Sequence, residues 1–195
     1  MNLRAPLSEG TVRRLRLGEE VRVDGRVVIG RDEVHMRALE LRRRGEEVPF
    51  DLQDGVLFHC GPIARKSGGG WEIIAAGPTT SARMNSLEPE FIREFRPRAI
   101  IGKGGMSRPT AEAMREHGCV YLAFTGGAAV LAAEGIRAVE RVEWLDLGMP
   151  EALWIVDARD LGPLVVAMDA HGGSLYEKVD REAGEALERI KKEIG

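Results

Sequence analysis

Three glycine-rich segments, at residues 77–84, 102–107 and 125–129, each follow a short apolar run. A strand that ends in glycine and small hydroxyl residues and then turns into a helix exposes backbone N–H groups, and these donors bind anions with the help of the helix dipole. Arg83 and Lys103 add positive charge beside those donors, and the planar arginine fork fits a carboxylate. The segments therefore predict a site for a small anionic ligand. The alternative is that the glycines only permit tight turns and that both cations are ordinary surface residues.

In the second segment, Gly102, Gly104 and Gly105 surround the lysine and are the expected backbone donors of the anion-binding loop. Their spacing lacks the four-residue spacer and the Lys-Ser/Thr ending of a phosphate-binding P-loop. It also lacks the Gly-x-Gly-x-x-Gly pattern of a dinucleotide-binding fold. A nucleotide ligand is therefore disfavoured.

A fourth polar cluster, at residues 30–35, places His35 near the expected start of a helix. The positive end of a helix dipole disfavours a charged histidine, so a neutral acid/base role is open beside that of a surface residue on an amphipathic helix. His59 and Cys60 end an apolar strand, where a thiol usually packs into a core. A metal or catalytic role for this pair is the less favoured alternative.

The segments between these loops predict a mixture of strands and helices. Residues 20–23 and 26–29 are rich in β-branched side chains and flank an Asp-Gly dipeptide, which predicts a β-hairpin. Apolar spacing over residues 33–44, followed by a glycine, predicts a helix. Further strands are predicted over residues 55–60, 71–76, 98–101, 120–124, 153–158 and 164–168, the last two as an antiparallel pair, and further helices from about 81 and over 89–95, 110–117, 128–134 and 180–194.

The whole chain, residues 1–195, is expected to form one domain, because 44% hydrophobic and 30% charged residues allow a core beneath a solvated surface. The order of elements predicts the α/β class, a mixed sheet with helices. A formal net charge of −3 without a long basic run disfavours nucleic acid as a partner. No apolar run is long enough to span a membrane, and the first residues lack the apolar core of a secretion signal, so the cytoplasm is the expected location.

The chain has two cysteines, Cys60 and Cys119. Two thiols exclude a disulfide scaffold, and they exclude a complete four-cysteine metal or cluster site within this chain. The residues therefore predict no metal site of the chain's own.

Four strings follow one another along the chain: Gly-Arg-Asp-x-x-His at 30–35, Gly-Pro-Thr-Thr-Ser-x-Arg-Met at 77–84, Gly-Lys-Gly-Gly at 102–105 and Thr-Gly-Gly-Ala-Ala at 125–129. Together they resemble the β subunit of class I (iron–sulfur) fumarate hydratase and its close relative, the L(+)-tartrate dehydratase β subunit. The resemblance covers nearly the whole chain, with the strings in family order, and the second string is the most specific. The same unit forms the C-terminal domain of single-chain class I fumarases.

The resemblance implies a swivelling β/β/α fold and an activity shared with an α subunit, which carries a [4Fe–4S] cluster on three cysteines of its own. It implies substrate-carboxylate contacts for Arg31, Arg83 and Lys103. It further implies a proton-transfer role for Thr79, helped by an acid of the α subunit, and an active-site position for His35. The two cysteines of this chain fit that division of labour, because this chain need not hold the cluster.

Reversible hydration of fumarate to L-malate is the first function that the resemblance implies, and dehydration of L(+)-tartrate to oxaloacetate is the second. A dianionic substrate needs fixed cations, and the developing aci-carboxylate needs more positive charge than the ground state does. Gly30 favours fumarate, because tartrate dehydratases often replace this glycine. A non-catalytic module that binds dicarboxylates is the alternative of another class. The expected partners are the α subunit and the dicarboxylate, with a homo-oligomer or an α2β2 assembly left open.

Overall fold

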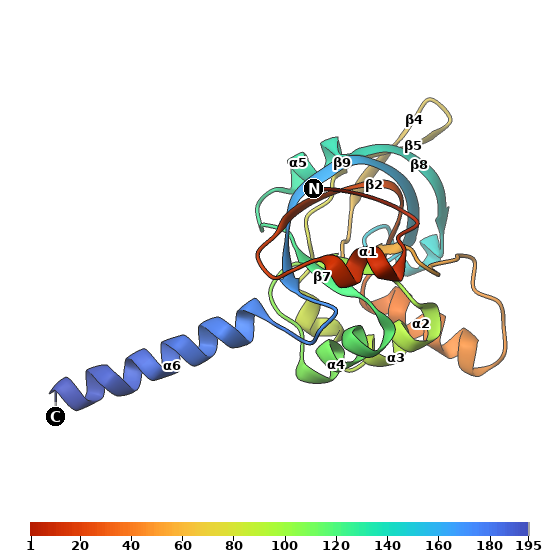
Figure 1. Ribbon diagram of the computed structural model, residues 1–195. Coiled ribbons are helices and arrows are strands. Elements are labelled where there is room, and N and C mark those ends of the chain that lie inside the picture. Colours follow the sequence, from red (N-terminus) through yellow and green to blue (C-terminus); the bar gives the residue numbers. More distant parts are fainter. Residues whose placement is uncertain (195) are drawn as a thin grey trace.

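Seven strands form one sheet that closes on itself in the computed structural model, which describes residues 1–194. The strands of this sheet are β1 (Asn2–Arg4), β2 (Glu20–Ile29), β3 (Val56–Phe58), β6 (Ala99–Gly102), β7 (Val120–Ala123), β8 (Ile136–Glu143) and β9 (Leu153–Met168). Strands β2, β3, β6 and β7 run parallel in that order. The long strand β9 then pairs antiparallel with both β7 and β2, which joins the two ends of the parallel row. Figure 1 shows the resulting ring of strands.

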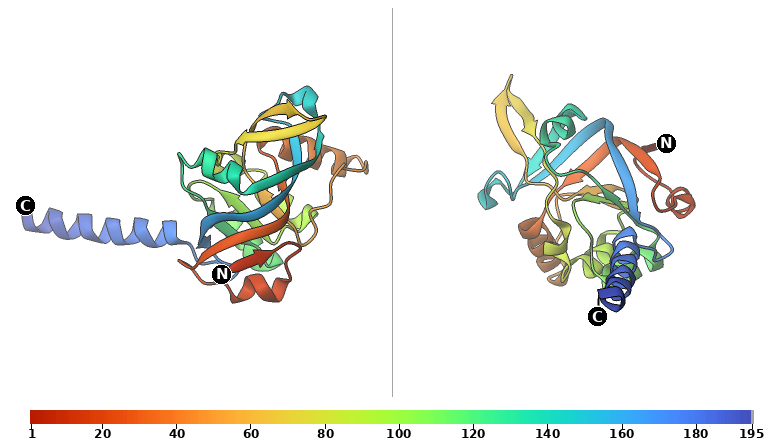
Figure 2. Two further views of the ribbon diagram at one scale, coloured as in Figure 1. Left: turned by 90° about the horizontal axis from the view of Figure 1, so that it is seen from above. Right: turned by 90° about the vertical axis from the view of Figure 1, so that its left-hand side faces the viewer.

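The other elements lie around this ring. They are the hairpin β4 (Ile63–Ser67) and β5 (Gly70–Ala75), and the helices α1 (Glu9–Arg14), α2 (Asp32–Arg43), α3 (Glu88–Phe95), α4 (Arg108–His117), α5 (Ala129–Glu134) and α6 (Leu175–Ile194), with short 3-10 turns η1 (Ser81–Met84) and η2 (Leu145–Leu147). Helices α2, α3 and α4 gather on one side of the strands (Figure 1). Helix α6 extends away from the body of the molecule in Figure 1 and in the left view of Figure 2.

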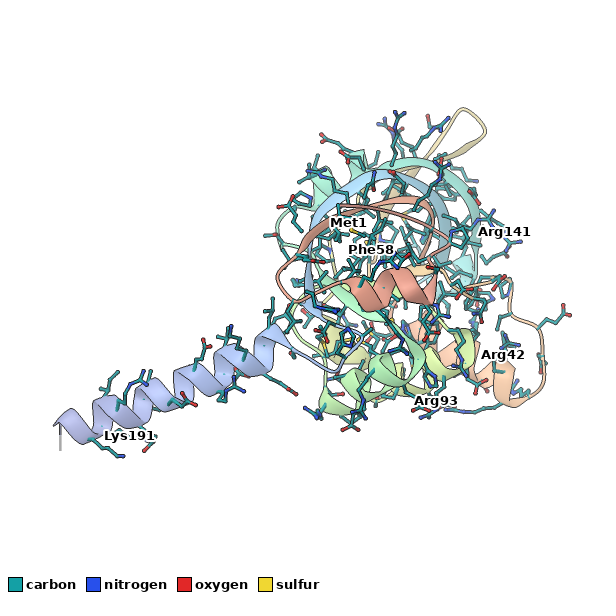
Figure 3. The ribbon with its side chains drawn as sticks, in the orientation of Figure 1. Met1, Arg42, Phe58, Arg93, Arg141 and Lys191 are labelled. Carbon is teal, nitrogen blue, oxygen red and sulfur yellow. The ribbon has the colours of Figure 1, made fainter. Side chains whose placement is uncertain are left out.

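Alternation of side chains along the parallel strands builds two hydrophobic cores. Phe58 and Ile29 face the first core, which fills the ring of strands, and the labelled Phe58 lies inside that ring in Figure 3. Leu57 and Ile100 face the second core, where they meet Phe91 and other side chains of the helical layer. Both faces of these strands are therefore buried, which is typical of parallel sheets covered by helices.

The predicted hairpin over residues 20–29 is wrong. A single ten-residue strand, β2, runs through the Asp24-Gly25 dipeptide, and its pairing with β9 shifts register on both sides of Val23. Gly25 has a φ of +93°, and a Cβ there would lie 2.8 Å from the carbonyl oxygen of Ala5. The glycine thus serves a bulge and a close approach of the first strand rather than a chain reversal.

The predicted antiparallel pair over residues 153–168 is also wrong, because β9 is one continuous strand of 16 residues. Its length lets it pair with β8 near its start, with β2 along most of its length and with β7 near its end. Strand β8 and helix α1 were not predicted from the sequence. The predicted helices over 33–44, 89–95, 110–117 and 128–134, and the predicted strands of the parallel row, are confirmed within about two residues at most ends.

The mixed α/β class predicted from the sequence is confirmed: the described residues form a sheet with six α-helices. None of the helices in residues 1–194 combines the length and the apolar character needed to cross a membrane.

Candidate anion-binding site

The four strands β2, β3, β6 and β7 end at the same edge of the sheet, because they run parallel and the residues at the ends of neighbouring strands pair with one another. Arg31 follows the end of β2, His59 follows β3, and Lys103 follows β6. Ligands of α/β folds bind outside the carboxyl ends of parallel strands, where backbone groups and loop side chains meet. Three predicted polar segments are thus brought to one edge by the topology alone.

The Gly-Pro-Thr-Thr segment lies between the ends of β3 and β6 and fixes Thr79 beside Lys103. The N–H of Thr79 donates to the carbonyl oxygen of His59 at 2.7 Å, and the N–H of Lys103 donates to the carbonyl oxygen of Thr79 at 3.2 Å. The N–H of Ser81 returns to the carbonyl oxygen of Lys103 at 2.9 Å. Residues far apart in sequence therefore form a short extra ladder at the strand ends.

Two of the three predicted cations are already paired with carboxylates of this chain. Arg83 holds Asp32 with two contacts, Nε to Oδ1 at 3.0 Å and Nη2 to Oδ2 at 2.9 Å. Arg31 Nη2 lies 2.5 Å from Glu151 Oε1. Among the side chains that the structure describes, those of residues 1–192, no carboxylate lies within ion-pair distance of Lys103. The three cations and two carboxylates therefore leave one positive charge uncompensated, and that charge belongs to Lys103.

The Thr79 side chain lies at the edge with 8% of the residue exposed. No hydrogen bond to its hydroxyl group is formed by the described part of the chain, so the hydroxyl can meet a ligand. A separate structural reason explains why glycine occupies each of three positions in the neighbouring loop. Gly104 has a φ of +75°, a Cβ at Gly105 would lie 2.9 Å from the Tyr176 ring, and a Cβ at Gly102 would lie 2.0 Å from Ser81 Oγ.

His35 lies beneath this edge rather than on it. It is fully buried, as are His59 and Glu88, and Glu88 Oε2 lies 3.2 Å from His35 Nε2 and 3.1 Å from His59 Nε2. Neither contact has the alignment of a regular hydrogen bond. The three side chains bring potential metal-ligating atoms within 4.8 Å of one another. Sequence reasoning missed Glu88, because nothing near the start of α3 distinguishes it from a solvated first-turn acid.

The two cysteines do not offer ligands at this edge. Both side chains are buried. Burial raises the pKa of the Cys60 thiol to about 12, and it also raises the pKa of Cys119. Iron–sulfur clusters bind thiolates, so these two protonated thiols do not fit the ligand set of a [4Fe–4S] cluster.

The family model for the fumarase C-terminus matches residues 1–179 of this chain. The chain belongs to the fumarase C-terminus family. The match includes all four predicted motifs and ends within α6, so most of the projecting helix lies outside it.

Relatives of this fumarase C-terminus domain carry the names of two hydro-lyases. It is 38% identical over 192 residues to the L(+)-tartrate dehydratase subunit beta of Escherichia coli K12, covering 98% of this chain and 94% of the relative. It is 42% identical over 185 residues to a Methanocaldococcus jannaschii protein provisionally named as the same subunit, covering 94% and 95%. It is 40% identical over 195 residues to a Geobacillus stearothermophilus protein provisionally named class I fumarate hydratase, of which it spans 37%. The predicted resemblance is confirmed, and the names do not distinguish fumarate from tartrate.

Proposed function

We propose that this chain is the β subunit of a hydro-lyase that acts on a four-carbon dicarboxylate, with fumarate as the first candidate substrate. The observation that carries the proposal is the meeting of Thr79, Lys103 and the two arginine–carboxylate pairs at one edge of the sheet. A planar dianion presents a carboxylate at each end, which suits separated cations. The names of the relatives point to the same class of reaction.

The reaction places demands that these side chains can meet. Hydration breaks one O–H bond of water and adds the hydroxyl group to one alkene carbon and a proton to the other. Negative charge moves onto the adjacent carboxylate in the transition state, so cations that face this carboxylate stabilise the transition state more than the ground state. Lys103 supplies the one uncompensated positive charge, and its ammonium is the group assigned to that carboxylate.

The arginines contribute orientation more than net charge. Arg83 uses Nε and Nη2 for Asp32, which leaves Nη1 for a substrate carboxylate. Its pair with Asp32 fixes the plane of the fork before substrate arrives, and a fixed fork loses less conformational entropy on binding. Arg31 is held by one contact, from its Nη2 to Glu151. Both arginines are therefore assigned to the carboxylate ends of the substrate.

Thr79 is assigned to the proton transfer on the reacting carbon. Its backbone is held on both sides by the ladder with His59 and Lys103, so its hydroxyl has a defined position at the edge. A threonine hydroxyl is too weakly acidic to act as a base unaided. An acidic residue of the α subunit therefore completes this step in the proposal.

The same proposal assigns the rest of the enzyme to a partner. An α subunit carries the [4Fe–4S] cluster, which supplies Lewis-acid chemistry when bound, and no residue of this chain holds it. The β subunit swivels against the α subunit to close the active site. The exposed side chains of Val179, Leu187 and Ile190 on α6 offer an apolar surface for such a partner. The assembly works in the cytoplasm, in the hydration step between fumarate and malate.

L(+)-tartrate dehydration is the second candidate, and the names of two relatives favour it. The sequence-based argument for fumarate rested on Gly30. A Cβ at this position would lie 2.7 Å from Val34 Cγ1, so packing within the start of α2 explains the glycine. Gly30 therefore no longer favours either substrate.

The test is an anaerobic reconstitution of this chain with its α subunit, assayed separately with fumarate, L-malate and L(+)-tartrate. Turnover of fumarate and malate supports the first candidate, and turnover of tartrate alone supports the second. Calorimetric titration of the isolated chain with the same three acids tests the alternative of a non-catalytic binding module. Tight binding by the isolated chain, with no turnover by the complex, identifies a non-catalytic dicarboxylate-binding module and overturns both.

A further inference from the structure

A buried cluster of ionisable side chains supports the anion-binding edge from below. Its centre is Glu88 at the start of α3, which faces His35 of α2 and His59 at the end of β3. All three side chains are fully buried. A charge removed from water is costly unless an opposite charge or hydrogen bonds compensate for it. The negative charge of Glu88 must therefore be compensated by protons on the histidines or by a bound cation.

The partners of the two ring nitrogens indicate the protonation state of His35. His35 Nδ1 lies 2.9 Å from the carbonyl oxygen of Arg31, which can only accept a hydrogen bond. Its Nε2 faces the Glu88 carboxylate, which also only accepts when ionised, so both nitrogens carry protons. Burial is the largest single influence and would lower the pKa of His35, but the charge and close contact of Glu88, together with the carbonyl oxygen of Arg31, outweigh it, so the pKa is raised. Asp32 is a second negative charge that acts on this ring, in the same direction.

The contact of His59 Nδ1 with Ser81 indicates that the His59 ring is neutral. Tyr121 donates its hydroxyl proton to Ser81 Oγ at 2.9 Å. His59 Nδ1, 2.9 Å from Ser81 Oγ, is the acceptor that the described residues offer for the Ser81 proton, so we place that proton on this contact. The remaining proton of His59 is then on Nε2, which faces Glu88. Burial is the main reason that the pKa of His59 is lowered, and the positive charge of His35 adds to it.

These proton positions favour a self-contained cluster over a metal site. Glu88 contributes one negative charge, His35 one positive charge and His59 none, so the buried groups sum to zero. A zinc ion bound by one carboxylate and two neutral histidines would leave a net charge of +1 without contact with water. Protons alone therefore balance the charge of the cluster.

Both ends of this chain of contacts reach the anion-binding edge. At one end the backbone of Arg31 accepts from His35. At the other end His59 accepts the N–H of Thr79 through its carbonyl oxygen and contacts Ser81 through its ring. Ser81 in turn donates its N–H to the carbonyl oxygen of Lys103. We propose that Glu88 is a positioning residue, which through its two histidines fixes the backbone of Arg31 and of residues 79–81 at the site.

The first test is nuclear magnetic resonance of the full isolated chain and does not depend on the proposed reaction. In the wild type at pH 7, above the ordinary pKa of histidine, the ¹⁵N shifts of the His35 ring should be those of an imidazolium. In Glu88→Gln they should be those of a neutral ring, and the amide signals of Thr79 and Lys103 should shift with them. The matched control is Glu90→Gln on the same helix, where the carboxylate is solvent-accessible and pairs with Arg43.

A neutral His35 in the wild type overturns the proposal, as do Thr79 and Lys103 signals that move no more in Glu88→Gln than in Glu90→Gln. One equivalent of zinc in the purified chain, measured by mass spectrometry, also overturns it. The glutamine keeps the size of the side chain and can donate to a neutral His35, so this variant should fold; circular dichroism checks this.

The second test uses the reconstituted complex and rests on the proposed function. Glu88→Gln should lower kcat/KM by about 10-fold or more, and Glu90→Gln should leave it within about 2-fold. Glu88→Asp, which keeps the charge, should recover part of the loss. Equal kinetics for Glu88→Gln and Glu90→Gln would overturn the positioning role. Should the wild-type complex turn over none of the three acids, the proposed function fails, and the resonance measurements still decide the role of Glu88.

Discussion

Replacing Lys103 with methionine tests the electrostatic description of the site most sharply. Two carboxylates of this chain offset Arg31 and Arg83, so Lys103 holds the uncompensated positive charge. Its removal takes the net charge of these five groups from +1 to zero while the side-chain volume stays similar. A single donor aimed at a developing oxyanion in a water-poor site contributes about 2.7–4 kcal/mol to transition-state binding. We therefore expect Lys103→Met to lower kcat/KM by about 10²-fold or more.

The assay is steady-state kinetics of the reconstituted complex, with the melting temperature of each variant measured in parallel. Lys103 is partly exposed at the end of β6, and substitutions at such positions usually change stability by about 0.5 kcal/mol or less. The melting temperature should therefore change by about 2 °C or less. Lys66→Met in the β4–β5 hairpin is the matched control, because Lys66 is exposed and contacts the Trp71 ring.

Kinetics of Lys103→Met equal to those of Lys66→Met would refute the reasoning, since an exposed lysine without a ligand contributes little. A large loss of melting temperature together with activity would refute it too, because the lysine would then act in folding.

Three further predictions follow from the geometry. Arg83→Lys keeps the charge but loses the two-pronged contact with Asp32 and the planar fork, so kcat/KM should fall by about 10-fold or more, and wild-type kinetics would contradict a carboxylate contact. Gly102→Ala should lower the free energy of unfolding by about 2 kcal/mol or more in urea denaturation, whereas Gly184→Ala in α6, with no neighbour within 4 Å of the new Cβ, should not. Burial would raise the pKa of Glu88, but its histidines outweigh burial and lower it from 4.5 to about 2. This carboxylate therefore stabilises the fold above about pH 4.5, and its contribution is lost as the pH falls toward 2. The free energy of unfolding of Glu88→Gln should fall less steeply with acid than that of the wild type; equal slopes would count against the ion pair.

The strand ends that carry the site were predictable, because their signals are local. A short apolar run followed by glycine, hydroxyl and cationic residues occurs wherever a buried parallel strand meets a ligand edge. Arg31 and Lys103 were placed on such ends from the sequence, and the parallel row brings them together. Thr79 follows β5 of the separate antiparallel hairpin, and backbone hydrogen bonds with His59 and Lys103 hold it at the same edge. The partners of the arginines were not predictable. Glu151 lies far along the chain from Arg31, and no local pattern marks their pairing.

The errors in the fold have the same origin. The Asp-Gly dipeptide in β2 has the residues of a hairpin turn. In the structure it lies at a bulge in the pairing with β9, where the backbone of Ala5 approaches closely. The predicted break between residues 158 and 164 is absent, because β9 continues through these residues with three other strands paired to its edges. Glu88 is a further case, since its burial depends on two histidines from distant elements. Each of these features depends on long-range contacts that a local sequence pattern does not report.

The most direct test of the central claim is one anaerobic comparison of three samples: this chain alone, the α subunit alone and the two combined after cluster reconstitution. Each is assayed with fumarate, L-malate and L(+)-tartrate, and its visible absorption is recorded. We predict that this chain alone is colourless and inactive, and that the combined sample turns over at least one of the three acids far faster than either part. A brown and active preparation of this chain alone, or an α subunit whose activity does not change when this chain is added, would contradict the account.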